Sequence, residues 1–375
     1  MTSLWLDGAP AVAPARPLAA PPEVVVVGGG VTGCSAALTL ARAGRRVRLL
    51  EEREVAGGAS GRNGGFALRG MPAPFDVTAA SAGEERAREL WIWTEEALAE
   101  LAALAGEAFR PLGSLRIAVD EEEREELRRE HEALREAGLR AEWLDDLPGP
   151  LAGRFAGAVR HPPDGVLQPA SWVRRLAGLA AAAGVEINQH HRLESLEQAE
   201  APLVLVATDG YPSGLLGELE GLIVPTRGQI VATEPIPERW YEVPHYGRHG
   251  FDYWHQTPEG RIVAGGFRDA ALATEFTAEE VTTSPVQRAL EAFVAELAGR
   301  PLRIDYRWAG IFGMVMDFLP VVGRVPGLEG VWVAGGYSGH GNVLGFACGQ
   351  LVARAILGEE APFLDLFEPA RLLAA

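Results

Sequence analysis

The sequence predicts a mixed α/β fold (α+β overall), in which a domain with a parallel sheet is interleaved with a second domain built on an antiparallel sheet plus helices. Two apolar runs, at 24–27 and 331–334, each lead into a glycine-rich loop and then a helical pattern, which is typical of parallel strands. Between them, three runs at 229–233, 250–256 and 261–266 have the composition of antiparallel strands. A chain of 375 residues is long enough for two hydrophobic cores.

The composition of the chain excludes several function classes. Its formal net charge of −17 repels nucleic acid and anionic membranes, so we expect neither as a partner. No apolar run reaches the roughly 18 residues that a membrane helix requires. Residues 1–22 lack the pattern of a signal peptide and resemble an extended arm anchored by Trp5, which favours a cytoplasmic location. The two cysteines, Cys34 and Cys348, form no CxxC pair, so the sequence predicts no metal site.

A dinucleotide-binding βαβ unit is predicted near the N-terminal end. Of its three glycines, Gly28 permits a tight turn, Gly30 lets the backbone approach a pyrophosphate, and Gly33 lets the next helix pack on the strand. A second strand follows at 47–50 and ends at Glu51, whose carboxylate suits the ribose hydroxyls. Because strand, glycines, helix, strand and acid occur in this order, the sequence predicts a Rossmann-like nucleotide domain.

Two further glycine-rich loops indicate FAD rather than NAD. The run 57–66 has five glycines within nine residues, and Ser60, Arg62 and Asn63 provide polar groups for a phosphate or a flavin edge. The loop 335–341 precedes an apolar helix, whose N-terminus suits the electron-rich N1 and C2 carbonyl of a flavin.

Together these elements resemble the D-amino-acid oxidase (DAO) family of FAD-dependent amine oxidoreductases, over nearly the whole chain. The run Gly-Ala-Ser-Gly-Arg-Asn-Gly-Gly at 58–65 is most similar to the γ-glutamylputrescine oxidoreductase branch. The arm with Trp5, the run 225–229 and Gly339-His340-Gly341 agree with that branch. The family's strand-end Ala-Thr-Gly motif corresponds to residues 207–209, with Asp209 in place of the glycine.

The pattern along the chain predicts an FAD-binding domain made of residues 1–75, 150–225 and 305–375, interleaved with a substrate-binding domain made of residues 76–149 and 226–304. The resemblance implies a set of cofactor contacts, including an adenine contact near Leu193. The expected cofactor-binding residues are Gly28, Gly30, Val31, Thr32, Gly33, Glu51, Glu52, Arg53, Ala59, Ser60, Arg62, Asn63, Gly64, Gly65, Phe66, Leu193, Ala207, Thr208, Gly310, Gly336, Gly339, His340, Gly341, Asn342 and Val343. Family members with covalent flavin use a cysteine within the stretch that corresponds to 305–325, and none occurs there, so we expect non-covalent FAD.

The expected reaction is oxidation of an amine C–N bond by hydride transfer to flavin N5, giving an imine that hydrolyses in water. The protein then contributes mainly positioning and a polar setting. Tyr253 and His255 share one face of a strand, and His340 lies in the loop that precedes the last long helix, so these three are the candidate catalytic residues. Sheet packing for the first two and a capping role for His340 are the structural alternatives.

Arg69, Trp308 and Phe312 are the candidate substrate-binding residues, although Arg69 equally fits a surface position. Amino-acid oxidases of the family bind the substrate carboxylate through an arginine in a Gly-x-Arg-Pro stretch. The corresponding stretch here, 309–314, has no arginine, and Phe312 stands in its neighbourhood. The resemblance therefore favours an amine or N-alkyl amine as substrate.

Three alternative functions remain beside the oxidation of an amine. They are a glycine or D-amino-acid oxidase, a non-catalytic flavin-binding subunit of a larger complex, and a disulfide reductase, which the absence of a second GxGxxG and of a cysteine pair disfavours. All 34 basic residues are arginines, so the lysine with which sarcosine oxidases activate O2 is missing. The choice between O2 and another electron acceptor stays open, as does the oligomeric state.

Overall fold

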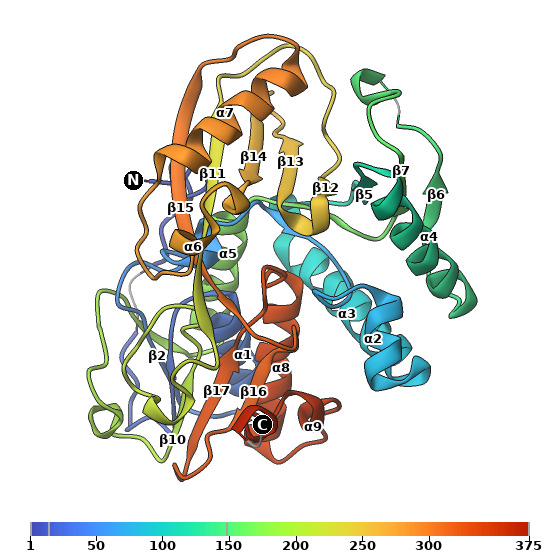
Figure 1. Ribbon diagram of the computed structural model, residues 1–375. Helices are drawn as coiled ribbons and strands as arrows, with labels where there is room; N and C mark the ends of the chain where they lie inside the picture. Colours follow the sequence, from blue (N-terminus) through green and yellow to red (C-terminus); the bar gives the residue numbers. More distant parts are fainter. Residues whose placement is uncertain (1, 14–15, 148, 374–375) are drawn as a thin grey trace.

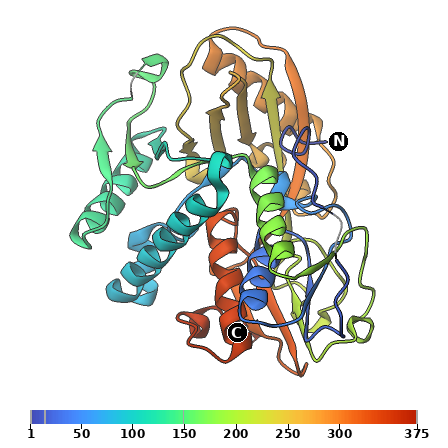
Figure 2. The same ribbon diagram turned by 180° about the vertical axis from the view of Figure 1, so that it is seen from behind.

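The computed structural model describes residues 2–13, 16–147 and 149–373, and these form two large sheets with helices packed around them (Figure 1). The described strands make a six-stranded sheet, an eight-stranded sheet and a small three-stranded sheet. In Figure 1 the six-stranded sheet lies in the lower half of the molecule and the eight-stranded sheet in the upper half, and Figure 2 shows the same arrangement from behind.

The six-stranded sheet is mostly parallel and has the order β16-β17-β10-β1-β2-β9. Its strands are β1 (Val24–Val27), β2 (Val47–Leu50), β9 (Glu186–Asn188), β10 (Leu203–Val206), β16 (Val321–Arg324) and β17 (Val331–Gly335). All four valines of β1 are buried, as expected of a central strand covered on both faces. Three helices pack together beside the sheet, namely α1 (Val31–Arg42), α5 (Pro169–Ala182) and α8 (Val343–Leu357).

The eight-stranded sheet is mostly antiparallel and has the order β15-β11-β14-β13-β12-β5-β7-β6. Its strands are β5 (Ser114–Ala118), β6 (Glu142–Leu144), β7 (Gly157–His161), β11 (Val224–Thr233), β12 (His245–Gly247), β13 (Asp252–Gln256), β14 (Ile262–Gly266) and β15 (Ile304–Met314). The helices α7 (Ser284–Ala298) and α6 (Leu272–Glu275) contact β11, and α4 (Glu121–Glu136) packs on β5 and β7.

The remaining elements join the two sheets or lie at their edges. They are the strands β3 (Phe66–Ala67), β4 (Phe109–Arg110) and β8 (Gly165–Leu167), and the helices α2 (Phe75–Ala82), α3 (Glu84–Ala105), α9 (Leu364–Phe367) and α10 (Ala370–Leu373). The long helix α3 contacts both α5 and α8. Within the described residues, no helix combines the length and the apolar character that crossing a membrane requires.

Two strands of the eight-stranded sheet come from segments that the sequence pattern assigns to the nucleotide domain. The strand β7, within the segment 150–225 assigned to the nucleotide domain, pairs with β5 and β6 in the eight-stranded sheet. The strand β15, within 305–375, pairs with β11 along its length in the same sheet. Because the partners of a strand are distant in sequence, the local pattern did not reveal the sheet to which these two strands belong.

Several predicted elements agree with the structure. The hairpin expected from runs at 250–256 and 261–266 is formed by β13 and β14, which pair antiparallel. The second predicted strand, 47–50, is β2 with the same bounds. The run at 229–233 is the end of a longer strand, β11, which begins at Val224.

Candidate functional site

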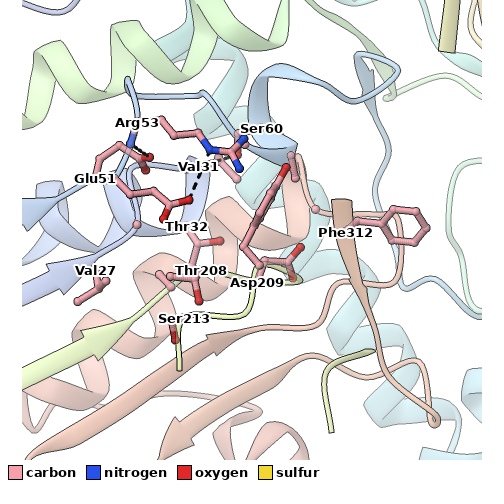
Figure 3. A pocket seen from close by; sticks show the side chains of 18 of the residues that line it. Val27, Val31, Thr32, Glu51, Arg53, Ser60, Thr208, Asp209, Ser213 and Phe312 are labelled. Carbon is pink, nitrogen blue, oxygen red and sulfur yellow. Dashed lines mark hydrogen bonds and ion pairs between the residues drawn. The ribbon is translucent and has the colours of Figure 1, made fainter. Parts of the chain in front are cut away.

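A long groove lies at the carboxyl ends of β1, β2 and β10, where ligands bind in open α/β sheets. Its volume is about 1180 Å³. Figure 3 shows Val27 and Glu51 toward one end of the groove and Phe312 at the other. The groove therefore connects the nucleotide-binding unit to a distant strand of the second sheet.

The glycine turn between β1 and α1 shapes the floor of this groove. Gly28 has a φ of +109°, and a Cβ there would lie 2.5 Å from the Ala207 carbonyl oxygen. A Cβ on Gly33 would lie 1.9 Å from the Gly28 carbonyl oxygen, so this glycine is required for helix packing. A Cβ on Gly30 would meet only Ser60 Oγ, at 3.0 Å, and Gly30 lines the groove. The predicted turn at Gly28 and the predicted close packing at Gly33 agree with these contacts, and the approach of Gly30 to a pyrophosphate stays a prediction.

The N-terminus of α1 supplies a positive dipole end to the groove. The helix begins at Val31, whose N–H donates to Ser60 Oγ at 3.0 Å, and its first turn holds no acidic residue. Glu51 lies at the end of β2 and accepts hydrogen bonds from the N–H groups of Gly29 (2.6 Å) and Arg53 (2.8 Å). Burial raises the pKa of Glu51, and these two backbone bonds oppose that shift. The arrangement suits a pyrophosphate beside the helix and a ribose beside Glu51.

The predicted flavin loop, 57–66, is fixed from two sides. Asn63 and Asn342 exchange side-chain hydrogen bonds of 3.1 and 3.2 Å, which join the loop to the start of α8. Trp5 Nε1 donates to the Asn63 carbonyl oxygen at 2.7 Å, so the predicted anchor role of Trp5 agrees with the structure. Trp308 Nε1 donates to the Arg62 carbonyl oxygen at 2.9 Å. The loop is therefore held in place by the N-terminal arm, by the start of α8 and by β15.

A second cavity, also of about 1180 Å³, adjoins the groove. Five residues line both spaces: Ala59, Asn63, Phe312, Gly339 and Asn342. We call this second space the substrate cavity. The other wall of the substrate cavity is formed mainly by strands β11 to β15 of the second sheet.

The donor set of the groove fits FAD. Glu51 would hold the ribose, the start of α1 would face the pyrophosphate, and the shared residues Asn63 and Asn342 would border the isoalloxazine ring. A single groove that reaches from Glu51 to the substrate cavity is what a dinucleotide with a reactive ring at one end requires. Among the residues that the structure describes, no group of three or more His, Cys, Asp or Glu side chains is arranged to hold a metal ion.

The predicted cofactor residues fall into three groups. The first lines the groove: Gly28, Gly30, Val31, Thr32, Glu51, Glu52, Arg53, Ala59, Ser60, Asn63, Leu193, Ala207, Thr208, Gly339, Gly341 and Asn342. The second lines the substrate cavity without lining the groove: Arg62, Gly64, Phe66, Gly310 and His340. The third lines neither space: Gly33, Gly65, Gly336 and Val343. A flavin ring at the boundary would lie where the groove and the substrate cavity meet, between residues of the first two groups.

The candidate catalytic residues lie in different surroundings. Tyr253 lines the substrate cavity, and burial raises the pKa of its hydroxyl. His340 lines the same cavity, and burial lowers its pKa to about 4. His255 shares the face of Tyr253, since both pack on Phe66, but it is covered by Trp5 and its Nε2 lies 3.0 Å from the Gly64 carbonyl oxygen. His255 therefore lies behind the cavity wall.

Two of the three candidate substrate residues also differ from the prediction. Arg69 is buried beneath the cavity, where it forms an ion pair with Glu95 and lies over the Trp91 ring. Trp308 is fully buried and does not line the substrate cavity. Phe312, by contrast, lies where the groove and the substrate cavity meet. A buried arginine with its own carboxylate is a structural cation, which the sequence position alone did not reveal.

Several residues at the site were missed by sequence reasoning. Tyr246 of β12 and Arg268 after β14 line the substrate cavity, and Tyr211 and Tyr337 line the groove. Neither Tyr246 nor Arg268 belongs to a local motif, so only the sheet brings them to the site. Asp209 was noted as replacing a glycine, and it adopts the left-handed conformation with a φ of +50°.

The chain matches a family model, DAO, described as FAD dependent oxidoreductase, over residues 23–355. It is 28% identical over 370 residues to gamma-glutamylputrescine oxidoreductase from Escherichia coli (strain K12), covering 91% of this chain and 85% of that protein. It is 26% identical over 379 residues to probable oxidoreductase OrdL from Haemophilus influenzae, covering 92% and 85% of the two chains.

Solved structures show the same fold. The crystal structure of glycine oxidase from Geobacillus kaustophilus has a TM-score of 0.75 at 23% identity, covering 94% of this chain and 99% of that one. L-proline dehydrogenase from P. horikoshii also has a TM-score of 0.75, at 22% identity, with coverages of 95% and 99%. Because the family model spans nearly the whole chain and the groove has the features that FAD requires, we conclude that this protein belongs to the DAO family of FAD-dependent oxidoreductases.

Proposed function

We propose that the protein oxidises the C–N bond of a small-molecule amine or N-alkyl amine in the substrate cavity. The observation that carries this proposal is the junction at Asn63, Phe312 and Asn342, which line both the groove and the cavity. FAD bound in the groove would supply a hydride acceptor, flavin N5. Relatives named for an amine or an amino acid support the same class of reaction.

The ionisable groups of the cavity support a positioning role for the protein. Burial raises the pKa values of Tyr246 and Tyr253 and lowers that of His340 to about 4, so all three side chains are neutral near pH 7. Neutral hydroxyl and imidazole groups hydrogen-bond an uncharged amine without stabilising its protonated form. Tyr253 and His340 thus orient the amine, which fits a reaction that needs no strong base.

Phe312 supports an amine over a simple α-amino acid. Its ring packs on Gly228 at the junction, where a cation would be needed to hold a carboxylate next to the reacting carbon. An aromatic ring there instead offers an apolar contact to the alkyl part of a substrate.

Anaerobic titration of the purified holoenzyme tests the function. The panel should contain alkylamines, N-methyl alkylamines, ω-amino carboxylates, glycine and D-alanine, with flavin absorbance as the readout. We expect bleaching by amines whose reacting carbon carries no carboxylate. Bleaching by glycine or D-alanine alone would contradict the proposal, and no bleaching by any compound would favour a non-catalytic flavin-binding subunit.

We further propose that FAD is held without a covalent bond and that the protein acts in the cytoplasm. Cys34 and Cys348 are both buried, and neither lines the groove or the substrate cavity, which supports non-covalent binding. Acid precipitation should leave the yellow colour in the supernatant, and colour retained in the pellet would refute this expectation.

A further inference from the structure

An arginine that the catalytic proposal does not use lies in the substrate cavity. Arg268 follows directly on Phe267, at the end of the β13–β14 hairpin, and its side chain lines the cavity. Its guanidinium lies over the Phe251 ring at 4.3 Å and near the Phe312 ring at 5.9 Å. The aromatic rings orient the guanidinium and exclude water from its faces.

The carboxylates around Arg268 are already paired with another arginine. Arg248 forms ion pairs with Asp252 at 2.6 Å and with Asp269 at 2.8 Å. Among the residues that the structure describes, Arg268 forms neither an ion pair nor a side-chain hydrogen bond, unlike the buried cation Arg69.

The surroundings make this unpaired charge costly. Burial lowers the pKa of Arg268, yet a guanidinium stays charged at any physiological pH. The nearby hydroxyls of Tyr246 and Tyr253 are neutral, so they do not compensate its charge. A partly desolvated cation binds an anion favourably, because the anion replaces the interactions with water that the cation has lost.

We propose that Arg268 is an anion subsite and that the substrate amine carries a carboxylate separated from the carbon that is oxidised. This inference rests on the proposed function, because it takes the cavity as the place where the amine binds. One planar guanidinium matches one carboxylate, with two parallel hydrogen bonds. A phosphate dianion would need additional donors, and the residues beside Arg268 are aromatic.

The separation between the substrate carboxylate and the carbon that is oxidised follows from the position of Phe312. Phe312 lines both the groove and the substrate cavity, whereas Arg268 lines only the cavity, with its guanidinium 5.9 Å from the centre of the Phe312 ring. An amine at the junction with Asn63 would therefore extend into the cavity before its anionic end reaches Arg268. Arg268 thus holds the far end of the substrate and not the group next to the reacting carbon.

Binding of probes that lack an oxidisable amine tests the subsite without turnover. Calorimetry on the holoenzyme should compare butanoate, butanamide and inorganic phosphate. We expect wild-type protein to bind butanoate at least about tenfold more tightly than butanamide, and Arg268→Gln to abolish that preference, since charge-assisted hydrogen bonds are lost. The matched control is Arg288→Gln, which removes the same charge from an exposed position on α7 outside the cavity.

Arg268→Lys is the second variant, because it retains a cation and loses the planar fork. It should keep a reduced preference for butanoate. Equal affinity of wild-type protein for butanoate and butanamide, tighter binding of phosphate than of butanoate, or a preference that survives in Arg268→Gln would each overturn the proposal. The comparison of butanoate with butanamide and phosphate on wild-type protein tests the anion subsite even if Arg268→Gln does not fold.

Steady-state kinetics then show where the substrate carboxylate lies relative to the carbon that is oxidised. Arg268→Gln should raise KM for 5-aminopentanoate at least about tenfold more than it raises KM for butylamine. A KM effect confined to glycine or D-alanine would place the anion next to the reacting carbon and overturn the proposed separation. Butanoate binding through Arg268 without flavin bleaching by any amine would refute the proposed function while leaving the anion subsite intact.

Discussion

The carboxylate of Asp209 accepts a hydrogen bond from the backbone N–H of Gly336 at 2.7 Å. Its second oxygen accepts one from the N–H of Gly313 at 3.0 Å. One side chain shortly after β10 therefore joins β15 of the second sheet to the loop after β17. A glycine at position 209, as in the family motif, would provide neither bond.

Replacing Asp209 should destabilise the fold. Asp209→Ala leaves two buried N–H groups without an acceptor and places alanine at a φ of +50°, so we expect a loss of about 2–5 kcal/mol of unfolding free energy. Asp209→Asn tolerates that φ and keeps one acceptor oxygen, so its loss should be smaller. Urea unfolding measures both, with Asp317→Ala, a partly exposed partner of Arg371, as the control. Equal stability of Asp209→Ala and wild-type protein would show that the two hydrogen bonds of Asp209 contribute nothing to the free energy of unfolding.

The three motif glycines should respond differently to a side chain. Gly30→Val places its methyl groups in the groove, so the variant should fold but be purified without flavin. Gly33→Ala forces a Cβ to 1.9 Å from the Gly28 carbonyl oxygen and should cost roughly 3 kcal/mol or more of stability. Flavin absorbance and circular dichroism separate the two effects. Gly178→Ala is the control, because its Cβ meets nothing within 4 Å, and a flavin-loaded Gly30→Val protein would refute the assignment of the groove.

Glu51→Gln should weaken FAD binding about tenfold or more. The glutamine amide group would face the N–H of Gly29 or of Arg53, and it offers one acceptor oxygen where Glu51 offers two. Quenching of flavin fluorescence during titration of the apoprotein gives the dissociation constant. Glu107→Gln, an exposed residue distant from the groove, serves for comparison. An unchanged constant for Glu51→Gln would mean that the ribose lies elsewhere.

His245 should make stability fall on acidification. It stacks on Trp254 at 5.0 Å, and burial lowers its pKa to about 3 from an ordinary value of 6.5. Between these values the unfolded chain binds the extra proton, so the contribution of the neutral ring is present above about pH 6.5 and is lost as pH falls toward 3. Relative to His245→Phe, wild-type protein should lose roughly 1.4 kcal/mol per pH unit in that window.

Urea unfolding at pH 8, 7, 6 and 5 checks this difference. Other buried groups titrate in the same range, among them Asp164 with a pKa raised to about 6, so only the gap between the two proteins is diagnostic. His190→Asn, a change at an exposed histidine, is the control variant for the same series of measurements. A constant gap for His245→Phe from pH 8 to 5 would contradict the prediction.

The nucleotide-binding unit could be read from the sequence because its determinants are local. The turn at Gly28, the helix α1, the strand β2 and Glu51 lie within 30 consecutive residues, and each follows from a short-range constraint. The pairing of β13 with β14 is equally local, since a short turn joins them. These elements have the predicted type, with bounds that differ by a few residues at most.

The substrate side could be predicted only in part, because sheet pairing brings its residues together from distant segments. Alternation along β13 correctly places Tyr253 and His255 on one face, but it says nothing about what covers that face. Trp5 and the Gly64 carbonyl cover His255, while Tyr253 opens onto the cavity. Arg268 has no local signal, because its role depends on neighbouring carboxylates being paired with Arg248.

The N-terminal arm has a consequence for the order in which the protein is assembled during synthesis. Ser3 donates to the Gly61 carbonyl, Trp5 packs on His255 and Trp308, and Asp7 accepts from Tyr306. Residues 3–7 therefore leave the ribosome some 300 residues before their last partners exist. Contacts of such sequence separation form late, since the long intervening chain must be ordered first. An arm that is made some 300 residues before its last partners is thus among the last parts to dock, and the loop 57–66 that it holds stays incomplete until translation has passed β15.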